Sequence, residues 1–266
     1  GPDTQQVLAV GDRVVSVPFL LRNGTPVPIG ANVAVDGAYA EYTVVPEKQI
    51  IPFETDLPWH VVGALPEMFQ TAYGSLTKGL DLRPGQSLLI RGGTSTVGLS
   101  AAAIAKETGA VVISTTRRPE RVGMLRAVGV DHPLVDDGNV ADAVRQLFAN
   151  GVDAALELVG GKTLRDTLQA TRIHGTACFT GALSDDWAIP NFSPLYHIPF
   201  GVRLTSYGGR ATDLPAEVFN QQLQAIADGR LKVSIAKVYH GLEQVANAQA
   251  ELEAATTPGK HVVVLD

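Results

Sequence analysis

The sequence contains few of the residues from which disulfide scaffolds and zinc centres are built. Its 266 residues include a single cysteine, Cys178, and six histidines, none of which lie four residues apart. One cysteine cannot form a disulfide within the chain, and it cannot supply the Cys₄ or Cys₂His₂ ligands of a structural zinc site. We therefore expect no bound metal, a reducing cytoplasmic environment, and Cys178 as a small residue of the core.

Long apolar runs and an excess of basic residues are also missing. No run approaches the ~18 apolar residues of a membrane span, so we expect no membrane segment. The formal net charge is −6 and the basic residues are scattered along the chain, which argues against nucleic acid as a partner. With 45% hydrophobic and 18% charged residues, the composition is that of a globular protein of one large or two ordinary domains.

The most informative segment covers residues 84–98, with the sequence PGQSLLIRGGTSTVG. It predicts a buried strand, a glycine-rich turn and the start of a helix, an order that places backbone N–H groups where a phosphate can bind. Ser95 replaces the central glycine of the G-x-G-x-x-G pattern, which adds a Cβ but offers a hydroxyl donor. An ordinary strand-to-helix turn is the alternative. A G-x-S-x-G nucleophile elbow is excluded, because Val97 stands at its second glycine.

A second strand-like segment, residues 111–115, follows at the distance expected for a βαβ unit. At the end of this strand an NAD site has Asp or Glu, which binds the ribose 2′-hydroxyl and would repel a 2′-phosphate. The sequence continues instead as TTRRPER, with no acid before Glu120. Because guanidinium groups pair well with phosphate oxygens, this segment favours NADP(H), with a solvated basic turn as the alternative.

Strands and helices alternate through the middle of the chain. The expected strands cover residues 88–91, 111–115, 133–135, 154–158, 175–180 and 202–206, and the expected helices cover 98–108, 119–128, 139–149 and 162–170. Such alternation with short loops predicts an α/β fold, a Rossmann-like doubly wound parallel sheet with helices on both faces.

The two ends of the chain differ from this middle. The head predicts short strands at 14–17, 32–35 and 42–45 and then a helix over 62–79, and the tail predicts helices at 214–228 and 243–255 with strands at 235–239 and 261–265. We predict that residues 1–65 and 209–266 form one β-rich domain and residues 66–208 the dinucleotide-binding domain, with the ligand cleft between them.

Seven short motifs occur in the order typical of one family: VGDRV (10–14), GAYAEY (37–42), ALP (64–66) leading to TAYG (71–74), LRPG (82–85), the 92–98 loop, ELVGG (157–161) and PGK (258–260). In this order the chain resembles the zinc-independent medium-chain dehydrogenase/reductases, in particular the quinone oxidoreductase or zeta-crystallin-like group. The resemblance implies a Rossmann domain beside a GroES-like catalytic domain, binding of NADPH, and metal-free reduction of quinones or α,β-unsaturated carbonyls. Family members carry a further segment ahead of VGDRV, so we expect this chain to be N-terminally incomplete in its catalytic domain.

The same resemblance implies a set of cofactor-binding residues and a partner. Thr94, Ser95, Thr96 and Val97, between Gly93 and Gly98, would face the pyrophosphate, and Arg117, Arg118 or Arg121, after Thr115, would hold the 2′-phosphate. Val159, Thr180 and Gly181 would flank the riboses, and Thr71 would lie near the nicotinamide, unless its hydroxyl only bonds its own helix. The family forms homodimers through an edge strand, which would be residues 202–206 here.

Two residues are candidates for acid–base chemistry. Glu67 stands where the zinc-dependent branch of the family has a metal ligand, and a carboxyl there could act as a general acid if burial raised its pKa. Tyr73 is the second candidate. The alternatives are a capping or ion-paired glutamate and a buried tyrosine whose hydroxyl is already satisfied.

These observations lead to three hypotheses about function. The first is an NADPH-dependent oxidoreductase that transfers hydride to a small-molecule quinone or α,β-unsaturated carbonyl, a reaction that needs alignment, dryness and an oxyanion donor but no metal. The second is a non-catalytic NADPH-binding or structural protein. The third is a zinc-type alcohol dehydrogenase whose other ligands are absent from this chain.

Overall fold

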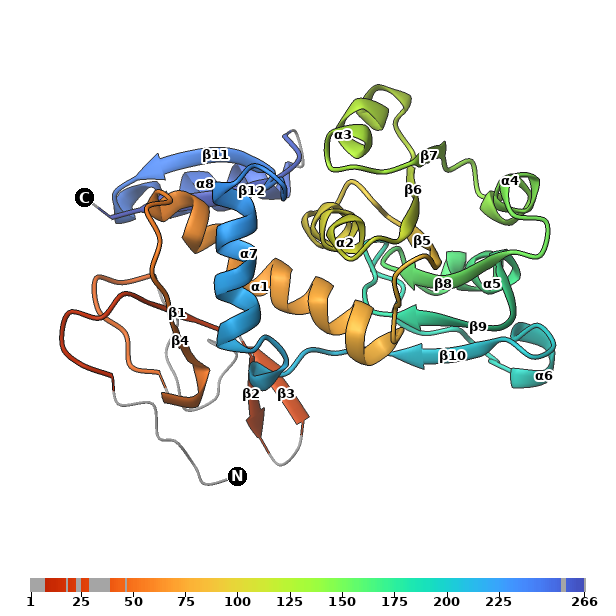
Figure 1. The fold of residues 1–266 in the computed structure, drawn as a ribbon, viewed down its shortest axis with the longest axis horizontal. Coiled ribbons are helices and arrows are strands. Elements are labelled where there is room, and N and C mark those ends of the chain that lie inside the picture. Colours follow the sequence, from red (N-terminus) through yellow and green to blue (C-terminus); the bar gives the residue numbers. More distant parts are fainter. Residues whose placement is uncertain are drawn as a thin grey trace.

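The computed structural model describes residues 8–17, 19–22, 25–28, 39–45, 47–254 and 257–265. Figure 1 shows these residues in two lobes that lie side by side. One lobe is built on a six-stranded sheet from the middle of the chain, and the other combines elements from its two ends. The domain boundaries near residues 65 and 209 stay predictions.

The larger lobe contains a parallel sheet with the strand order β7-β6-β5-β8-β9-β10. Its strands are β5 (Ser87–Arg91), β6 (Val111–Thr116), β7 (His132–Val135), β8 (Val152–Glu157), β9 (Thr171–Phe179) and β10 (Arg203–Ser206). Every neighbouring pair is parallel. Counted from its first strand, the order is that of the doubly wound dinucleotide-binding fold. The predicted α/β fold is therefore confirmed.

Helices cover both faces of this sheet. They are α2 (Thr96–Glu107), α3 (Val122–Ala127, after a 3₁₀ turn at Pro119–Arg121), α4 (Val140–Leu147), α5 (Gly161–Ala170) and the short α6 (Pro194–His197). Successive strand residues point to opposite faces. Leu88 and Ile90 accordingly pack into the core beneath α2, whereas Leu89 packs into a separate core beneath α4 and α5.

Helix α1 (Trp59–Gly74) lies between the lobes and continues into a π-helical turn, Ser75–Gly79. It packs on α2, and its Leu65 and Phe69 side chains are fully buried. The helix predicted over 62–79 is thus confirmed, with Pro66 inside it. Gly74 permits a close approach to the larger lobe, because a Cβ at this position would lie 1.9 Å from the Tyr207 hydroxyl.

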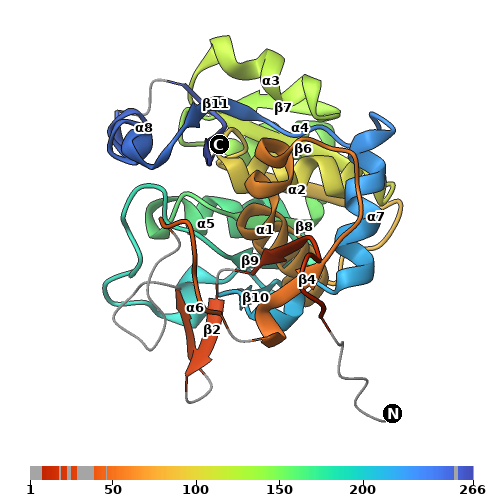
Figure 2. The ribbon, with the colours of Figure 1, turned by 90° about the vertical axis from the view of Figure 1, so that its left-hand side faces the viewer.

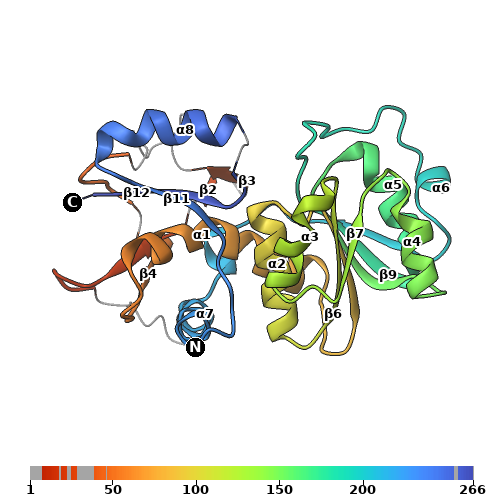
Figure 3. The ribbon, with the colours of Figure 1, turned by 90° about the horizontal axis from the view of Figure 1, so that it is seen from above.

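The smaller lobe, in its described part, contains three separate two-stranded sheets. They pair β1 (Val14–Ser16) with β4 (Ile50–Pro52), β2 (Phe19–Arg22) with β3 (Thr25–Pro28), and β11 (Ile235–His240) with β12 (Lys260–Val264). Helices α7 (Ala216–Ala227) and α8 (Val245–Glu253) complete the lobe. Figure 3 shows α8 lying over β11 and β12, and Figure 2 shows β2 at the opposite end of the lobe.

The head of the chain departs from its predicted strands. The strand expected at 14–17 corresponds to β1, but residues 42–45 form no strand, so that prediction is wrong. An alternating pattern becomes a strand only when a neighbouring strand supplies hydrogen bonds, and none pairs with residues 42–45 in the described chain. The strand expected at 32–35 lies outside the described residues. Within the described ranges, no helix is both long and apolar enough to cross a membrane.

Candidate functional site

The glycine-rich loop between β5 and α2 is closed by Ser95, which caps the helix. Its Oγ accepts a hydrogen bond from the Gly98 N–H at 3.1 Å and donates to the Gly92 carbonyl at 2.9 Å. A serine at this position satisfies one of the unpaired N–H groups of the first helical turn. The hydroxyl that we expected as a donor to a phosphate is therefore used within the loop, and that expectation is corrected.

Two glycines allow this loop to lie directly against β6 and α2. A Cβ on Gly93 would stand 1.8 Å from the Ser114 Oγ, and a Cβ on Gly98 would stand 2.7 Å from the Gly92 carbonyl oxygen. Neither position can hold a larger residue without moving backbone or a buried side chain. Gly93 and Gly98 thus shape the loop, as the sequence pattern predicts.

Backbone amides of the same loop remain available to a bound anion. Across the described residues, the N–H groups of Thr94, Thr96 and Val97 have no protein acceptor. They belong to the loop and to the N-terminus of the twelve-residue helix α2, where the helix dipole also favours negative charge. The loop therefore has the form of a phosphate cradle.

A small cavity, the outer compartment, lies beside the loop at the carboxyl ends of β5 to β8. Its volume is about 100 Å³, and it is lined by Gly92, Thr94, Ser95, Thr115, Thr116, Arg117, Asp136, Val159, Leu183 and Ser184. The Arg117 side chain is exposed and forms no ion pair with any described residue. Arg118 and Arg121 do not line the compartment. The basic turn thus contributes Arg117 to the cavity, with two further arginines outside it.

A larger cavity, the inner compartment, adjoins it, since both include Ser95 and Leu183. Its volume is about 650 Å³, and it is lined by Glu67, Thr71, Ser95, Thr96, Val97, Leu158, Phe179, Thr180, Gly181, Ala182, Leu183, Trp187, Ser206, Tyr207 and Gly208. These residues come from α1, from the loop, and from the carboxyl ends of β8, β9 and β10. The cleft therefore runs from the edge of β7 to helix α1, with the glycine-rich loop at its centre.

One wall of the inner compartment is held by a hydrogen-bond network that is neutral except for Asp213 at its end. The fully buried Gln70 donates through Nε2 to the Tyr207 hydroxyl and to the Arg210 carbonyl oxygen, both at 2.9 Å. Tyr207 in turn donates to the Asp213 carboxylate at 3.0 Å. Burial, and after it the charge of Asp213, raises the pKa of Tyr207, so this phenol keeps its proton.

The same network fixes the hydroxyl of Thr71. Because the carbonyl of Arg210 can only accept, the Gln70 nitrogen must face it, and the Gln70 Oε1 is left to accept from the Thr71 Oγ1 at 3.3 Å. The hydroxyl hydrogen of Thr71 is then used in the hydrogen bond to Gln70 Oε1. The lone pairs of the Thr71 oxygen remain available to a donor in the compartment. The alternative in which Thr71 bonds its own helix backbone is not what the structure shows.

Further along the cleft wall, Thr180 contacts two buried residues. Its Oγ1 lies 3.0 Å from the Ser75 Oγ and 3.5 Å from the Cys178 Sγ. Burial raises the pKa of the Cys178 thiol, which keeps it protonated and unreactive. Cys178 is fully buried, so the prediction that it is a small core residue is confirmed.

The two acid–base candidates have different surroundings. Glu67 lines the inner compartment, and its Oε2 forms an ion pair with the Lys260 Nζ of β12 at 2.6 Å. This is the ion-paired alternative, although the carboxylate still faces the cavity. Tyr73 packs against the main core and does not line either compartment. The structure therefore brings Glu67, but not Tyr73, to the cleft.

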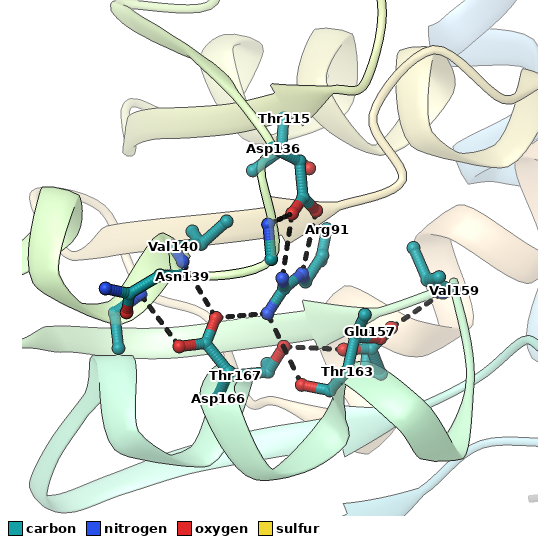
Figure 4. A network of polar contacts seen from close by, with 12 residues as sticks. Arg91, Thr115, Asp136, Asn139, Val140, Glu157, Val159, Thr163, Asp166 and Thr167 are labelled. Carbon is teal, nitrogen blue, oxygen red and sulfur yellow. Dashed lines mark hydrogen bonds and ion pairs between the residues drawn. The ribbon is translucent and has the colours of Figure 1, made fainter.

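A buried ionic network lies beneath the outer compartment (Figure 4). The fully buried Arg91, the last residue of β5, makes two hydrogen bonds of 2.9 Å to the Asp136 carboxylate and a third, charged one to Asp166 of α5. Burial opposes the charge of this guanidinium, but Asp136, Asp166 and Glu157 outweigh that effect and raise the pKa of Arg91. The guanidinium is therefore permanently charged.

Glu157, at the end of β8, holds the loop that follows it. Its Oε1 accepts from the Val159 and Gly160 N–H groups at 2.6 and 3.1 Å, and its Oε2 accepts from the Thr167 hydroxyl at 2.5 Å. Burial raises the pKa of Glu157 against these hydrogen bonds, which favour the ionised form. The carboxyl fixes Val159 on the rim of the outer compartment.

Ten of the residues predicted to bind a cofactor line one of the two compartments. They are Thr71, Thr94, Ser95, Thr96, Val97, Thr115, Arg117, Val159, Thr180 and Gly181. Sequence reasoning missed Asp136, Leu183, Ser184, Trp187 and Tyr207, which follow strand ends. The available signal was position: all five follow the carboxyl end of a parallel strand, where ligands bind in this fold, Trp187 by eight residues and the others by five or fewer.

The chain is similar in sequence to proteins of known families. Residues 96–221 match the zinc-binding dehydrogenase family. A probable quinone oxidoreductase of Leishmania amazonensis is 27% identical over 268 residues, which cover 90% of this chain and 77% of the relative.

Solved structures agree in fold. The structure of AibC matches with a TM-score of 0.82 at 24% identity, over 100% of this chain and 76% of that protein, a likeness that concerns the fold alone. A mycobacterial protein solved in complex with NADPH matches with a TM-score of 0.76 at 27% identity, over 97% of this chain and 75% of that one. Together these likenesses support a quinone oxidoreductase-like protein of the medium-chain dehydrogenase/reductase type.

Proposed function

We propose that this chain binds NADP(H) in the cleft and reduces a quinone or an α,β-unsaturated carbonyl compound without a metal. The observation that carries the proposal is the loop 92–98, which presents backbone amides unpaired in the described part of the chain. Beside it, the segment that follows β6 contributes Arg117 to the cavity and no acidic residue. The close packing of Gly93 and Gly98 fits the first and third glycines of the dinucleotide-binding motif, which form the tight turn and bring the helix against the strand. The mycobacterial neighbour, solved with NADPH, supports the same cofactor.

Different residues of the cleft would bind different parts of the cofactor. The amides of Thr94, Thr96 and Val97 would hold the pyrophosphate, and Arg117 would hold the 2′-phosphate, with Arg118 and Arg121 adding positive potential. Thr180, Gly181 and Thr71 line the inner compartment, where the nicotinamide would lie. When bound, a reduced nicotinamide supplies a hydride to an electrophilic acceptor.

The inner compartment supplies the conditions for that chemistry. Its walls include the apolar side chains of Val97, Leu158, Phe179, Leu183 and Trp187, a lining that suits an apolar acceptor. Glu67 lines the same compartment as one half of an ion pair with Lys260, and we propose that this pair orients the acceptor. Tyr73 lacks this access and would act only indirectly.

The test is NADPH oxidation, followed by absorbance, with a panel of quinones and enones and with NADH as the control. Oxidation of NADPH well above that of NADH supports the reductase and the arginine assignment together. Binding of NADPH without turnover favours a non-catalytic binding protein. Zinc in the purified protein, at one atom per chain, favours the alcohol dehydrogenase hypothesis.

The proposal includes a cytoplasmic homodimer. β10 forms an edge of the described sheet, and side chains near this edge, such as Leu195, Tyr196 and Phe200, are exposed and apolar. An uncovered edge strand beside apolar surface is a common site of self-association. Sedimentation velocity distinguishes a dimer from a monomer directly, and a monomer at all concentrations would refute this part.

A further inference from the structure

The outer compartment has a carboxylate where a phosphate is proposed to bind. Of its described lining residues, Asp136 is the only acid, and it shares the cavity with Arg117 and Thr116. Its backbone N–H donates to the Thr116 carbonyl at 2.8 Å, which keeps the end of β7 beside the end of β6. A free carboxylate at this place would repel a 2′-phosphate, which carries about −1.5 to −2 charges.

Arg91, which lies beneath the outer compartment, offsets the negative charge of Asp136. Its Nε and one terminal nitrogen donate to the two oxygens of Asp136, each at 2.9 Å, in the planar two-bond geometry typical of strong arginine–carboxylate pairs. The Asp136 Oδ1 also accepts from the Gly138 N–H at 3.0 Å. In the described structure, Oδ2 has the Arg91 Nε as its only hydrogen-bond donor.

The other two acids around Arg91 are satisfied away from the compartment. Asp166 accepts from the Val140 and Ala141 N–H groups at 2.9 and 3.2 Å and so caps helix α4. Glu157 is surrounded by the amides and hydroxyls that follow β8. Of the three carboxyl groups, Asp136 therefore has the greatest influence on the charge of the cavity.

We propose that Arg91 determines cofactor specificity without touching the cofactor: by pairing with Asp136 it offsets the carboxylate of the outer compartment and so allows a 2′-phosphate to bind beside Arg117. Arg91 is a positioning residue, since it acts through Asp136. The inference rests on the proposed function, because it concerns which dinucleotide the cleft accepts.

The experiment compares two probes by isothermal titration calorimetry: 2′,5′-ADP and 5′-AMP. The two share base, ribose and 5′-phosphate, so the ratio of their dissociation constants isolates the 2′-phosphate. The variants are D136N, R91M and the double variant R91M/D136N. D166N is the matched control, because it removes the same charge from the same arginine outside the cavity.

The ratio of the two dissociation constants should shift in opposite directions in D136N and in R91M. D136N removes the one acid among the described lining residues of the outer compartment while Arg91 keeps its charge, so it should favour 2′,5′-ADP over 5′-AMP by several-fold relative to the wild type. R91M exposes the Asp136 charge and should disfavour 2′,5′-ADP by about tenfold, and the double variant should return the ratio to near the wild-type value. D166N should change the ratio little. If R91M does not fold, the sign of the shift in D136N, compared with D166N, still tests the inference.

Three results would overturn the inference. One is a wild-type ratio in D136N, or in R91M where that variant folds. The second is an equal loss of both probes in D136N, which would show that Asp136 binds the base itself. The third is a D166N ratio that shifts as much as that of D136N, which would mean a non-local charge effect. Failure of the wild-type protein to bind either probe would instead refute the proposed function, and the inference with it.

Discussion

The two compartments of the cleft differ in how their polar groups are satisfied. Around the outer compartment the groups are charged: the fully buried Arg91 pairs with Asp136, and the exposed Arg117 has no ion-pair partner among the described residues. Around the inner compartment the buried network is mostly neutral and passes from Thr71 through Gln70 to Tyr207, ending at Asp213. We expect charge to govern recognition in the first, and dryness and orientation to govern chemistry in the second.

A change in the glycine-rich loop should disturb both compartments, because both are lined by this loop. Gly93→Ala places a Cβ 1.8 Å from the Ser114 Oγ, so the loop must move away from β6. We expect binding of NADPH and of NADH to weaken by about 100-fold or more, equivalent to about 2.7 kcal/mol. Titration calorimetry measures both.

The control is Gly63→Ala, at a helical position where a Cβ meets nothing within 4 Å. This variant should bind both dinucleotides as the wild type does. Equal binding by Gly93→Ala and Gly63→Ala would show that the loop is not the phosphate cradle.

The inner compartment is tested by Tyr207→Phe. The change removes the hydrogen bond that Tyr207 donates to the buried Asp213 carboxylate. An unsatisfied buried acceptor costs about 1–3 kcal/mol, so we expect the free energy of unfolding, measured with urea, to fall by about that amount. The preference for 2′,5′-ADP over 5′-AMP should not change, because this network lies outside the outer compartment.

Tyr73→Phe is the matched control. Both tyrosines pack against the main core, but the Tyr73 hydroxyl has no hydrogen-bond partner in the described residues. We expect its loss to change the free energy of unfolding by less than about 0.5 kcal/mol. Similar destabilisation by the two variants would mean that the Tyr207–Asp213 bond contributes little.

The outer compartment is tested by reversing its exposed charge. Arg117→Glu should weaken binding of NADPH by about tenfold and leave NADH nearly unchanged, since one more acid faces the proposed 2′-phosphate. Arg126→Glu, on the exposed face of α3, is the control with the same change in net charge. If both variants weaken NADPH alike, the effect is one of overall charge and Arg117 is not the 2′-phosphate ligand.

The sequence predicted the larger lobe far better than the smaller one, for a physical reason. Buried parallel strands such as β5 and β6 are continuous apolar runs between helices, and this signal is local. The β2–β3 hairpin was missed although Asn23-Gly24, a strong turn signal, stands between its strands. The error at 42–45 has the opposite cause, because a strand pattern alone cannot show whether a partner strand is present.

The site shows the same limit. The loop, Arg117 and Thr180 follow from motifs and strand ends, so their place in the cleft could be predicted. The pairing of Arg91 with Asp136 and Asp166 joins residues 45 and 75 positions apart, which only the strand order brings together. Ser95 lines both compartments, but we expected from the sequence that its hydroxyl would serve a phosphate, and the structure shows it capping helix α2.

The smallest effect is expected at the amino ends of the central strands, opposite the cleft. There Asp153, near the start of β8, accepts from the N–H and hydroxyl of Ser87 at 2.8 and 2.7 Å and pairs with Arg172 at 2.7 Å. Burial would raise the pKa of this carboxyl, but the hydrogen bonds from Ser87 and Arg172 prevail and lower it. The pair is distant from the carboxyl ends of the strands, so we expect a purely structural role.

A carboxyl whose pKa is lowered by folding stabilises the protein above its unfolded pKa and loses that effect as the pH falls through the folded value. The free energy of unfolding of the wild type should therefore fall more steeply between about pH 5 and pH 3 than that of Asp153→Asn. Asp185→Asn, at an exposed aspartate, should keep the wild-type slope. Binding of 2′,5′-ADP at neutral pH should be the same in all three proteins, because Asp153 lies at the amino ends of the strands and Asp136, which lines the cavity, lies at their carboxyl ends. A change in that binding in Asp153→Asn would contradict this separation.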